Sequence, residues 1–306
     1  MTIDIDQARR ALHEGALLLR APALGTLEIT GKERQTWLNG MVTCDLAPKR
    51  AGEGAYGFAV GKNGKLLAEV FVVLDDERIL LGVAANRLEM LAQHFDKYII
   101  MEDVTLEDVS SSFGWTLAHG PQAANLVAIA RAHGAVAAAA VDMTGKGGAL
   151  LVLDANSAEG IETRLQKEKG APIVLGDEPT WDKLRVEIGI SKWGVDFTDD
   201  NYPQEAALEQ LGVSFQKGCY LGQEAVFMLQ MRGHVKKKIV RLAIEGGEPL
   251  SNSAPITLPD NTAVGHVTSS TPNPDKPGII ALGYVKWKHT PSGTELAVDG
   301  RKSVVG

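Results

Sequence analysis

The chain has 306 residues, which exceeds the usual size of one hydrophobic core and predicts two or three domains. Its composition, 44% hydrophobic and 23% charged, is typical of a folded globular protein. The 31 basic and 38 acidic side chains give a net charge of −7, which argues against general binding to nucleic acid or to an anionic membrane. We therefore expect any anionic ligand to be held by a local basic cluster, and we expect no direct nucleic-acid binding.

The start of the chain, MTIDIDQARRALHEG, carries acidic residues early and lacks the apolar stretch of a secretory signal. No later run is apolar and long enough to span a bilayer, so the sequence predicts a cytoplasmic protein without membrane contact. The two cysteines, Cys44 and Cys219, have no Cys or His at metal-finger spacing. Neither a metal site nor a disulfide is expected.

In chain order, residues 6–20 have apolar positions at helical spacing and predict a helix, which the strand LGTLEITG follows. KERQTWLNGMVT predicts a short helix. The apolar runs 55–60 and 66–74 flank Asn63-Gly64, a pair typical of tight turns, and predict a β-hairpin. Residues 85–100 predict an amphipathic helix. Its expected core face comprises Leu88, Leu91, Phe95 and Ile99.

The pattern restarts near Ser112 with a strand at 113–120, an alanine-rich helix after Pro121, a strand at 149–154 and a helix at 157–170. This alternation predicts a small α+β domain. After Lys238 the chain carries short strands divided by Pro, Gly, Asn and Asp, which favour a small barrel or sandwich.

The most informative segment runs from Trp181 to Arg232. Within it, KGCYLGQE at 217–224 matches the signature of the YgfZ family, and LRVEIG at 184–189 and PQEA at 203–206 resemble elements of aminomethyltransferases. The chain therefore resembles a YgfZ-type folate-binding protein of the aminomethyltransferase (GcvT-like) superfamily over nearly its whole length.

The resemblance implies an α+β fold of three domains around a central channel, namely two α+β domains and a C-terminal β-barrel. The implied limits are 1–111 with 179–237 for a discontinuous folate-binding domain, 112–178 for a small α+β domain and 238–306 for the barrel. Tetrahydrofolate or a folate derivative is the implied cofactor and small-molecule partner.

Glu187 is the best candidate for holding the pterin, because one carboxylate can accept hydrogen bonds from the ring N–H and the adjacent exocyclic amine. An ion pair of Glu187 with Arg185 is the alternative. The expected cofactor-binding set is Glu187, Tyr220, Gln223, Glu224 and Arg232. For Gln223 and Glu224, a structural role in the first turn of the following helix competes with ligand contact.

The anionic glutamyl tail of the cofactor needs cations. The basic residues that follow the signature are Arg232, Lys236, Lys237, Lys238 and Arg241. Arg232 is the stronger candidate, and a solvated charge run is the alternative for the three lysines.

Cys219 is expected to be a functional thiol, with Lys217 orienting its thiolate or contacting the ligand. It lies between Lys217 and a predicted helix near Gly222, and both a cation and a helix N-terminus favour the thiolate. Cys44 is expected to be a core residue.

Aminomethyltransferases carry a catalytic Asp pair just after the glycine turn of the first hairpin. Aligned on Gly64, this chain has Leu67 and Ala68 there, and Glu69 is one residue late, which directs it to the opposite face of a strand. The resemblance thus implies folate binding without aminomethyl transfer, and it leaves open whether the chain is an enzyme.

The implied function is that of an accessory protein for assembly, repair or maintenance of iron-sulfur enzymes, including tRNA-modifying ones, which it would contact transiently. The alternative is a tetrahydrofolate-dependent aminomethyl or methyl transferase with relocated acids such as Glu69 or Asp45. A ligand-sensing module is the third hypothesis.

Overall fold

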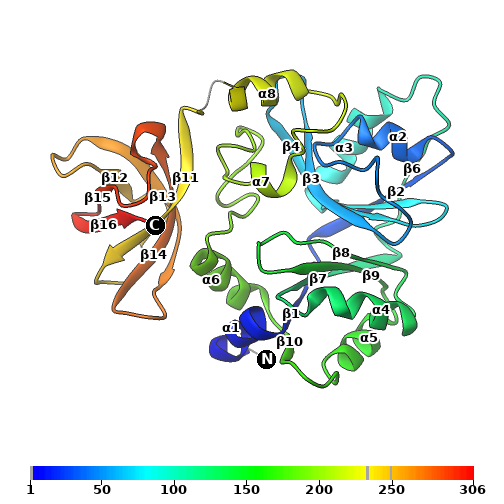
Figure 1. The fold of residues 1–306 in the computed structure, drawn as a ribbon, viewed down its shortest axis with the longest axis horizontal. Coiled ribbons are helices and arrows are strands. Elements are labelled where there is room, and N and C mark those ends of the chain that lie inside the picture. The colour runs from blue at the N-terminus through cyan, green and yellow to red at the C-terminus, as the bar shows by residue number, and fades with distance from the viewer. Residues whose placement is uncertain (1–2, 232–233, 249) are drawn as a thin grey trace. The chain divides into compact units, whose positions relative to one another are not determined.

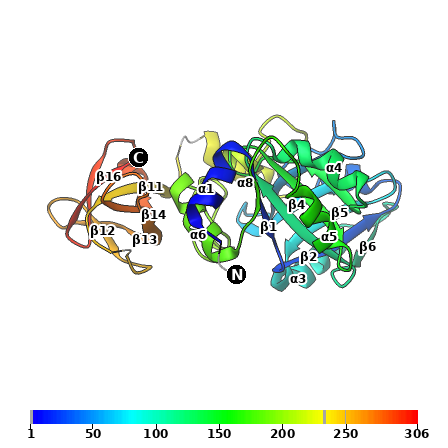
Figure 2. The same ribbon diagram turned by 90° about the horizontal axis from the view of Figure 1, so that it is seen from below.

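A computed structural model describes residues 3–231, 234–248 and 250–306. The chain divides into two compact units. Unit 1 comprises Met1–Thr180 and Leu211–Gln223, and unit 2 comprises Trp181–Gln210 and Glu224–Gly306. Figures 1 and 2 show the ribbon of each unit with its elements labelled. Among the described residues, no helix has the length and apolar character needed to cross a membrane.

Unit 1 contains two five-stranded sheets. In spatial order, the first consists of β3 (Gly54–Val60), β4 (Leu66–Leu74), β5 (Ile79–Ala84), β2 (Leu24–Thr30) and β6 (Thr105–Asp108). The second consists of β10 (Ile173–Leu175), β1 (Ala16–Arg20), β7 (Phe113–His119), β9 (Gly148–Asp154) and β8 (Ala137–Ala140). All neighbouring strands are antiparallel except β1 and β10, which are parallel.

Helices cover one face of each sheet. On the first sheet lie α2 (Arg34–Asn39) and α3 (Ala85–Asp96), and on the second lie η1 (Ala123–Asn125), α4 (Leu126–Ala132) and α5 (Ala158–Leu165). The other faces of the two sheets meet at Trp115 of β7, whose Nε1 donates to Thr26 Oγ1 at 2.9 Å. Gly82 of β5 leaves room for this indole, because a Cβ there would lie 2.9 Å from it.

The hairpin and the amphipathic helix were predicted from the sequence, and the structure contains both. Strands β3 and β4 are joined by a turn in which Gly64 has φ +77°, a conformation that glycine adopts without strain. In α3, Leu88, Leu91 and Phe95 are buried, and Ile99 just beyond the helix is partly buried against the same core.

The helix predicted over residues 6–20 is too long. Helix α1 spans Ile5–Glu14, with Asp4 as its N-cap, and residues 16–20 form strand β1 instead. A short apolar run such as ALLL cannot be assigned by periodicity alone, and here it is buried on both faces in the middle of a sheet. Gly15 lies between the helix and the strand and allows the chain to pass close to Pro172, because a Cβ at Gly15 would lie 1.9 Å from the carbonyl oxygen of Pro172.

The points at which the chain passes from one unit to the other lie within three short helices. These are α6 (Glu178–Ile188), α7 (Glu209–Gly212) and α8 (Gln223–Met231). Unit 2 also contains a closed barrel. Its strands, in spatial order, are β11 (Lys237–Glu245), β14 (Gly278–Lys286), β13 (Ala263–Pro272), β12 (Pro255–Thr257), β15 (Glu295–Val298) and β16 (Arg301–Val305). A 3-10 turn, η2 (Trp287–His289), follows β14.

The predicted α+β class with a C-terminal barrel is confirmed. The predicted domain limits and the central channel stay predictions. Strand β1, which the prediction groups with residues 1–111, hydrogen-bonds to β7 and β10 in the second sheet.

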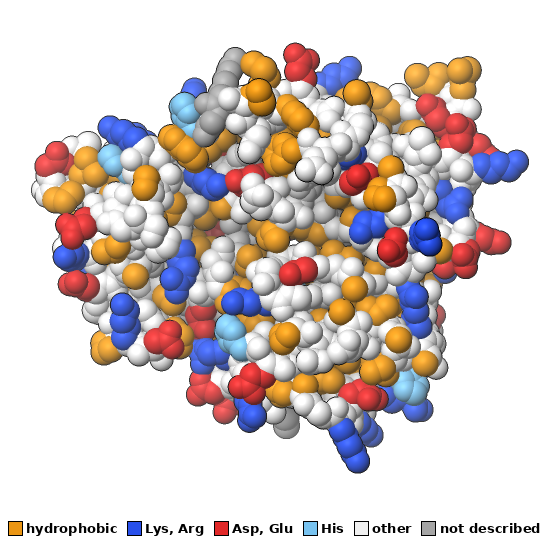
Figure 3. All heavy atoms as spheres, in the orientation of Figure 1, with side chains coloured by type: hydrophobic (Ala, Val, Ile, Leu, Met, Phe, Trp, Pro, Cys, Tyr) orange, Lys and Arg blue, Asp and Glu red, His pale blue; other side chains and the backbone are white. Residues whose placement is uncertain are grey.

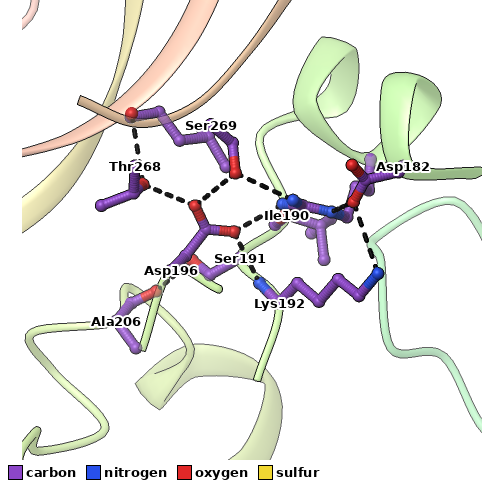
Figure 4. Close-up of polar contacts among 10 residues, drawn as sticks. Asp182, Ile190, Ser191, Lys192, Asp196, Ala206, Thr268 and Ser269 are labelled. Carbon is purple, nitrogen blue, oxygen red and sulfur yellow. Dashed lines mark hydrogen bonds and ion pairs between the residues drawn. The ribbon is translucent and has the colours of Figure 1, made fainter. Parts of the chain in front are cut away.

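A buried ion pair joins α6 to the barrel within unit 2 (Figure 4). Arg185 of α6 is 1% exposed, and its Nη1 donates to Asp196 Oδ2 at 2.5 Å. Its Nη2 donates to Ser269 Oγ at 2.9 Å, and its Nε donates to Asp182 Oδ1 at 2.7 Å. Burial of two charges is tolerated only when hydrogen bonds satisfy them, and this pair meets that condition.

The barrel supplies two hydroxyls to the same carboxylate. Thr268 Oγ1 and Ser269 Oγ donate to Asp196 Oδ1 at 2.5 and 2.7 Å. Consecutive residues of a regular strand point to opposite faces, but the register of β13 against β14 shifts between Val267 and Ser269. This bulge allows both hydroxyls to reach one acceptor.

We expect Asp196→Asn to destabilise unit 2 by about 3–5 kcal/mol, because it removes the buried charge partner of Arg185 and leaves only the more exposed Asp182. Urea unfolding followed by tryptophan fluorescence measures the loss. The exposed Asp275→Asn, also in unit 2, is the control. Equal unfolding midpoints for the two variants would show that the pair contributes nothing.

Candidate functional site

The signature loop of unit 1 is anchored by Lys217, which is buried. Its Nζ donates to the backbone oxygens of Asn39, Val42 and Cys44 at 2.6, 2.9 and 2.6 Å. These bonds use all three donors of the ammonium group, so none remains for the sulfur of Cys219. Burial lowers the pKa of Lys217 to about 8. The contacts therefore make Lys217 a structural anchor of the loop, and the expected orientation of a thiolate by this residue finds no support in them.

Cys219 itself is exposed, whereas Cys44 is buried as expected. Helix α8 begins four residues after Cys219, with Gln223 and Glu224 in its first turn. Gln223 Nε2 donates to Gly218 O at 3.3 Å, and Glu224 is exposed. The signature places its polar residues on a short loop and a helix start, as the sequence predicts.

The signature's glycine and tyrosine have packing roles. Gly222 has φ +80°, and a Cβ there would lie 2.3 Å from the carbonyl oxygen of Gly61. Tyr220 is 6% exposed, its ring lies 5.3 Å from Lys217 Nζ, and its hydroxyl has no hydrogen-bond partner among the described residues. Burial raises the pKa of Tyr220.

A cavity of about 310 Å³ lies within unit 1. Its walls come from the segment after α2, from β3, from the end of β8 and from residues 211–214, and its polar lining includes Asp45, Tyr56, Asp142 and Ser214. Thr43 holds the last of these segments, because Thr43 Oγ1 donates to Gly212 O at 2.6 Å and Ser214 N donates to Thr43 O at 2.9 Å.

Glu69 stands next to this cavity. Its Oε1 accepts a 2.5 Å hydrogen bond from the hydroxyl of Tyr56, which lines the cavity. Burial raises the pKa of Glu69 to about 7, although the bond from Tyr56 opposes the shift. Ala68 is fully buried in the core on the helix-covered face of the sheet, and Leu67 packs against that core. A carboxylate is therefore present in this hairpin, but on the other face from Ala68.

Asp142, which lines the cavity, directly precedes the segment MTGKGG at 143–148. Its Oδ1 accepts hydrogen bonds from the backbone nitrogens of Thr144 and Gly145 at 2.9 and 2.8 Å. Burial raises the pKa of Asp142, and these hydrogen bonds outweigh it, so the net pKa is lowered. The carboxylate of Asp142 therefore stabilises the turn that follows it.

Glu187 belongs to unit 2 and is half-buried near the end of α6. Its backbone oxygen accepts a 3.0 Å hydrogen bond from Arg241 Nε. Arg185 pairs with Asp182 and Asp196, and the alternative ion pair of Glu187 with Arg185 stays a prediction. Glu187 and the signature loop lie in separate units, and Arg232 lies outside the described residues.

Two of the three predicted tail-binding lysines have structural partners. Lys237 Nζ lies 4.4 Å from the ring centroid of Tyr284, and Lys238 Nζ pairs with Glu209 Oε1 at 2.7 Å. Lys236 is exposed. Figure 3 shows basic and acidic side chains interspersed on the visible face of the molecule.

Sequence reasoning missed Tyr56 and Asp196. The alternation of Tyr56 and Phe58 in β3 could have placed Tyr56 on the face of Glu69, once the hairpin register was known. No local pattern identifies Asp196 as the acceptor for the barrel, because the two hydroxyl groups that donate to it are 72 and 73 residues away.

The fold and these sites define a mixed α+β protein with a C-terminal barrel. Residues 2–145 match the GCVT N-terminal domain family, and residues 237–305 match the glycine cleavage T-protein C-terminal barrel domain family. An aminomethyltransferase of Herpetosiphon aurantiacus is 27% identical over 94% of this chain and 84% of the relative. The mitochondrial aminomethyltransferase of Mus musculus is 26% identical over 90% of this chain and 73% of the relative.

The crystal structure of glycine cleavage system aminomethyltransferase T from Bartonella henselae superposes with a TM-score of 0.80, at 20% identity, over 98% of this chain and 87% of that chain. The chain carries two domains of the GcvT-like superfamily, in residues 2–145 and 237–305. Its assignment to the YgfZ branch stays a prediction.

The pKa of Glu69 predicts a pH-dependent stability. The unfolded carboxyl group loses its proton near 4.5 and the folded one near 7, so stability falls as the pH rises between these values. We expect Glu69→Gln to gain about 3 kcal/mol relative to wild type across this window. Urea unfolding at several pH values measures the gain, with the exposed Glu77→Gln variant as background. Parallel pH profiles for wild type and Glu69→Gln would contradict a buried, protonated Glu69.

The two cysteines should differ in reactivity. Burial raises the pKa of Cys44 to about 11, whereas Cys219 is exposed. We expect iodoacetamide to modify Cys219 at least about tenfold faster than Cys44 in the native protein, as peptide mass mapping measures. Equal rates, or faster modification of Cys44, would mean that the native loop shields Cys219.

Proposed function

We propose that this chain binds tetrahydrofolate and transfers a one-carbon group, aminomethyl or methyl, with Glu69 as the proton-handling residue. The observation that carries the proposal is the Glu69 carboxyl group, whose pKa is raised to about 7 and which binds the hydroxyl of Tyr56 at the cavity wall. The two domains of the GcvT-like superfamily and relatives named aminomethyltransferases support the same reaction class.

Bound tetrahydrofolate supplies a ring nitrogen that accepts the one-carbon group. A general base or acid works best when its pKa lies near the working pH, and Glu69 satisfies this condition. Tyr56 fixes Oε1 of Glu69 and thereby orients the carboxyl group. Glu69 could then take up at Oε2 the proton that the accepting nitrogen loses and give it to the amine that leaves the donor. In this scheme Glu69 replaces the acid that Leu67 and Ala68 cannot supply.

The residues present are compatible with a pterin. The cavity volume of about 310 Å³ lies at the lower end of the range for small-molecule sites. Asp45, in its lining, uses Oδ1 to accept from Ala47 N at 3.1 Å and has a second carboxylate oxygen for a ring N–H. Glu187, in the LRVEIG element, is the acceptor that the superfamily resemblance implies. The two carboxylates are competing candidates for the pterin edge.

The reaction is tested by mixing the protein with tetrahydrofolate and candidate aminomethyl or methyl donors. We expect a folate product from the wild type and a rate lowered about 10²- to 10⁴-fold in Glu69→Gln, the usual contribution of a general acid or base. The wild-type rate should depend on a group that titrates near pH 7. Full activity of Glu69→Gln would remove this residue from the mechanism, and no product from any donor would refute the transferase proposal.

Calorimetric titration with tetrahydrofolate separates the two pterin acceptors. We expect Glu187→Gln to weaken binding by more than about tenfold, since it removes the charged acceptor while keeping the side-chain size. Asp45→Asn is the matched comparison. If only Asp45→Asn weakens binding, the pterin is held in the cavity of unit 1 without Glu187. Equal affinity of both variants and wild type would exclude both residues.

The accessory role for iron-sulfur enzymes is the second candidate, and the exposure of Cys219 within the matched signature favours it. Complementation of a strain lacking its own YgfZ protein tests this role through the activity of its iron-sulfur and tRNA-modifying enzymes. Cys219→Ser should fail and Cys44→Ser should complement. A Cys219→Ser variant that complements fully would leave this thiol without a role.

A further inference from the structure

Glu69, the residue proposed above to handle protons, is not among the described residues that line the cavity of unit 1. Strand β3 contributes Gly54, Ala55 and Tyr56 to that lining, whereas Glu69 is half-buried on the neighbouring strand β4. The hydroxyl of Tyr56 donates a 2.5 Å hydrogen bond to Glu69 Oε1. Of the two bonded residues, Tyr56 is therefore the one that a ligand in the cavity would contact.

The alternation of side chains along β3 directs Tyr56 toward the cavity. Positions 54, 56 and 58 share one face of the sheet. A Cβ on Gly54 would lie 2.9 Å from Val141 Cγ2. A Cβ on Gly212 would lie 2.4 Å from Cε2 of Phe58. Val141 and Gly212 both line the cavity, so two of its walls lie against the face of β3 that carries the Tyr56 ring.

The strand register places Tyr56 and Glu69 on the same face. Tyr56 lies opposite Phe71 and Phe58 lies opposite Glu69, so Tyr56 and Glu69 are diagonal neighbours. The Tyr56 ring packs against the rings of Phe58 and Phe71, with centroids 5.4 and 5.5 Å away. These aromatic contacts hold the hydroxyl group beside the carboxyl group of Glu69.

The two groups have complementary protonation behaviour. Burial, and then the charge of Glu69, raise the pKa of Tyr56 well above its ordinary value, so the phenol keeps its proton at rest. Burial raises the pKa of Glu69 to about 7, so this carboxyl group can gain or lose a proton at neutral pH. A hydroxyl group can accept a hydrogen bond from a ligand while it donates its own proton to Glu69. Tyr56 can therefore pass a proton on without becoming ionised.

We propose that Tyr56 is a catalytic residue that carries protons between a ligand in the cavity and Glu69. The proposal rests on the proposed one-carbon transfer. Tyr56 accepts at its hydroxyl oxygen the proton that the accepting nitrogen loses, while its own hydroxyl proton moves to Oε1 of Glu69. Tyr56 stays neutral and Glu69 becomes a carboxylic acid. The reverse movement gives a proton to the amine that leaves the donor.

Rates of folate-product formation separate this path from direct exchange at Oε2, in which Tyr56 only orients Glu69. We expect Tyr56→Phe to lower the rate as much as Glu69→Gln does, about 10²- to 10⁴-fold, and the double variant to lose no more than either single variant. Tyr98→Phe, outside the cavity lining, is the control and should keep the wild-type rate.

Two results would overturn the proton path. A loss in Tyr56→Phe at least about tenfold smaller than in Glu69→Gln would leave Tyr56 with an orienting role only. Losses that multiply in the double variant would show that the two residues act independently. No product from wild type would refute the transfer reaction and this path with it, whereas a normal wild-type rate with a fully active Tyr56→Phe would refute the path alone.

A measurement on the ligand-free protein tests the pair without any reaction. The hydrogen bond from Tyr56 lowers the pKa of Glu69 and so opposes the effect of burial. We expect Tyr56→Phe to raise the pKa of Glu69 above its wild-type value, as NMR titration of isotope-labelled glutamate carboxyl groups measures. Glu69→Gln identifies the resonance. The same pKa of Glu69 in wild type and in Tyr56→Phe would show that the hydroxyl does not bind the carboxylate in solution, and it would overturn the proposal.

Discussion

The arrangement of the signature loop depends on one buried ammonium group. Lys217 reaches from the segment before α8 to the carbonyl of Asn39 at the end of α2 and to those of Val42 and Cys44 after it, more than 170 residues earlier in the chain. Charge-assisted hydrogen bonds of this kind are stronger than neutral ones, and a buried ammonium cannot give them up without a large desolvation cost. The same contacts fix Cys44 O and hold the wall of the cavity near Asp45. Cys219, two residues further along the loop, is exposed.

Unit 2 also contains a buried charge that is satisfied by hydrogen bonds, in this case an ion pair. Arg185 and Asp196 are both buried. The bulge of β13 supplies two hydroxyl groups that donate hydrogen bonds to Asp196. A buried pair of this kind is weak evidence for net stability, but removing one partner leaves an uncompensated buried charge. Val186, next to Arg185, packs with Ile239 and Leu282 of the barrel. The position of Glu187, the next residue of α6, is therefore fixed by its neighbours.

Local patterns predicted the elements whose signals are local. The Asn63-Gly64 turn, the apolar face of α3 and the short strands of the barrel all followed from turn chemistry and periodicity. Residues 16–20 were assigned wrongly because a strand buried on both faces has no alternation to distinguish it from a helix. The partners of Lys217 and Asp196 could not be predicted either. Carbonyls and hydroxyls far away in sequence carry no pattern that marks them as partners.

The alternation of side chains between the two faces of strand β4 connects the sequence to the proposed chemistry. An acid at position 68 would point into a core that is closed by α2 and α3, where Ala68 now packs. An acid at position 69 points to the other face and meets Tyr56. The hydroxyl gives the carboxylate one hydrogen bond, while burial still holds its pKa near 7, so the group keeps a proton that it can exchange. Ala68 thus leaves the helix-covered face of the hairpin without an acid, while Glu69 keeps a carboxyl group on the other face. The loss of the usual motif is therefore a weaker argument against transferase activity than the sequence alone suggests.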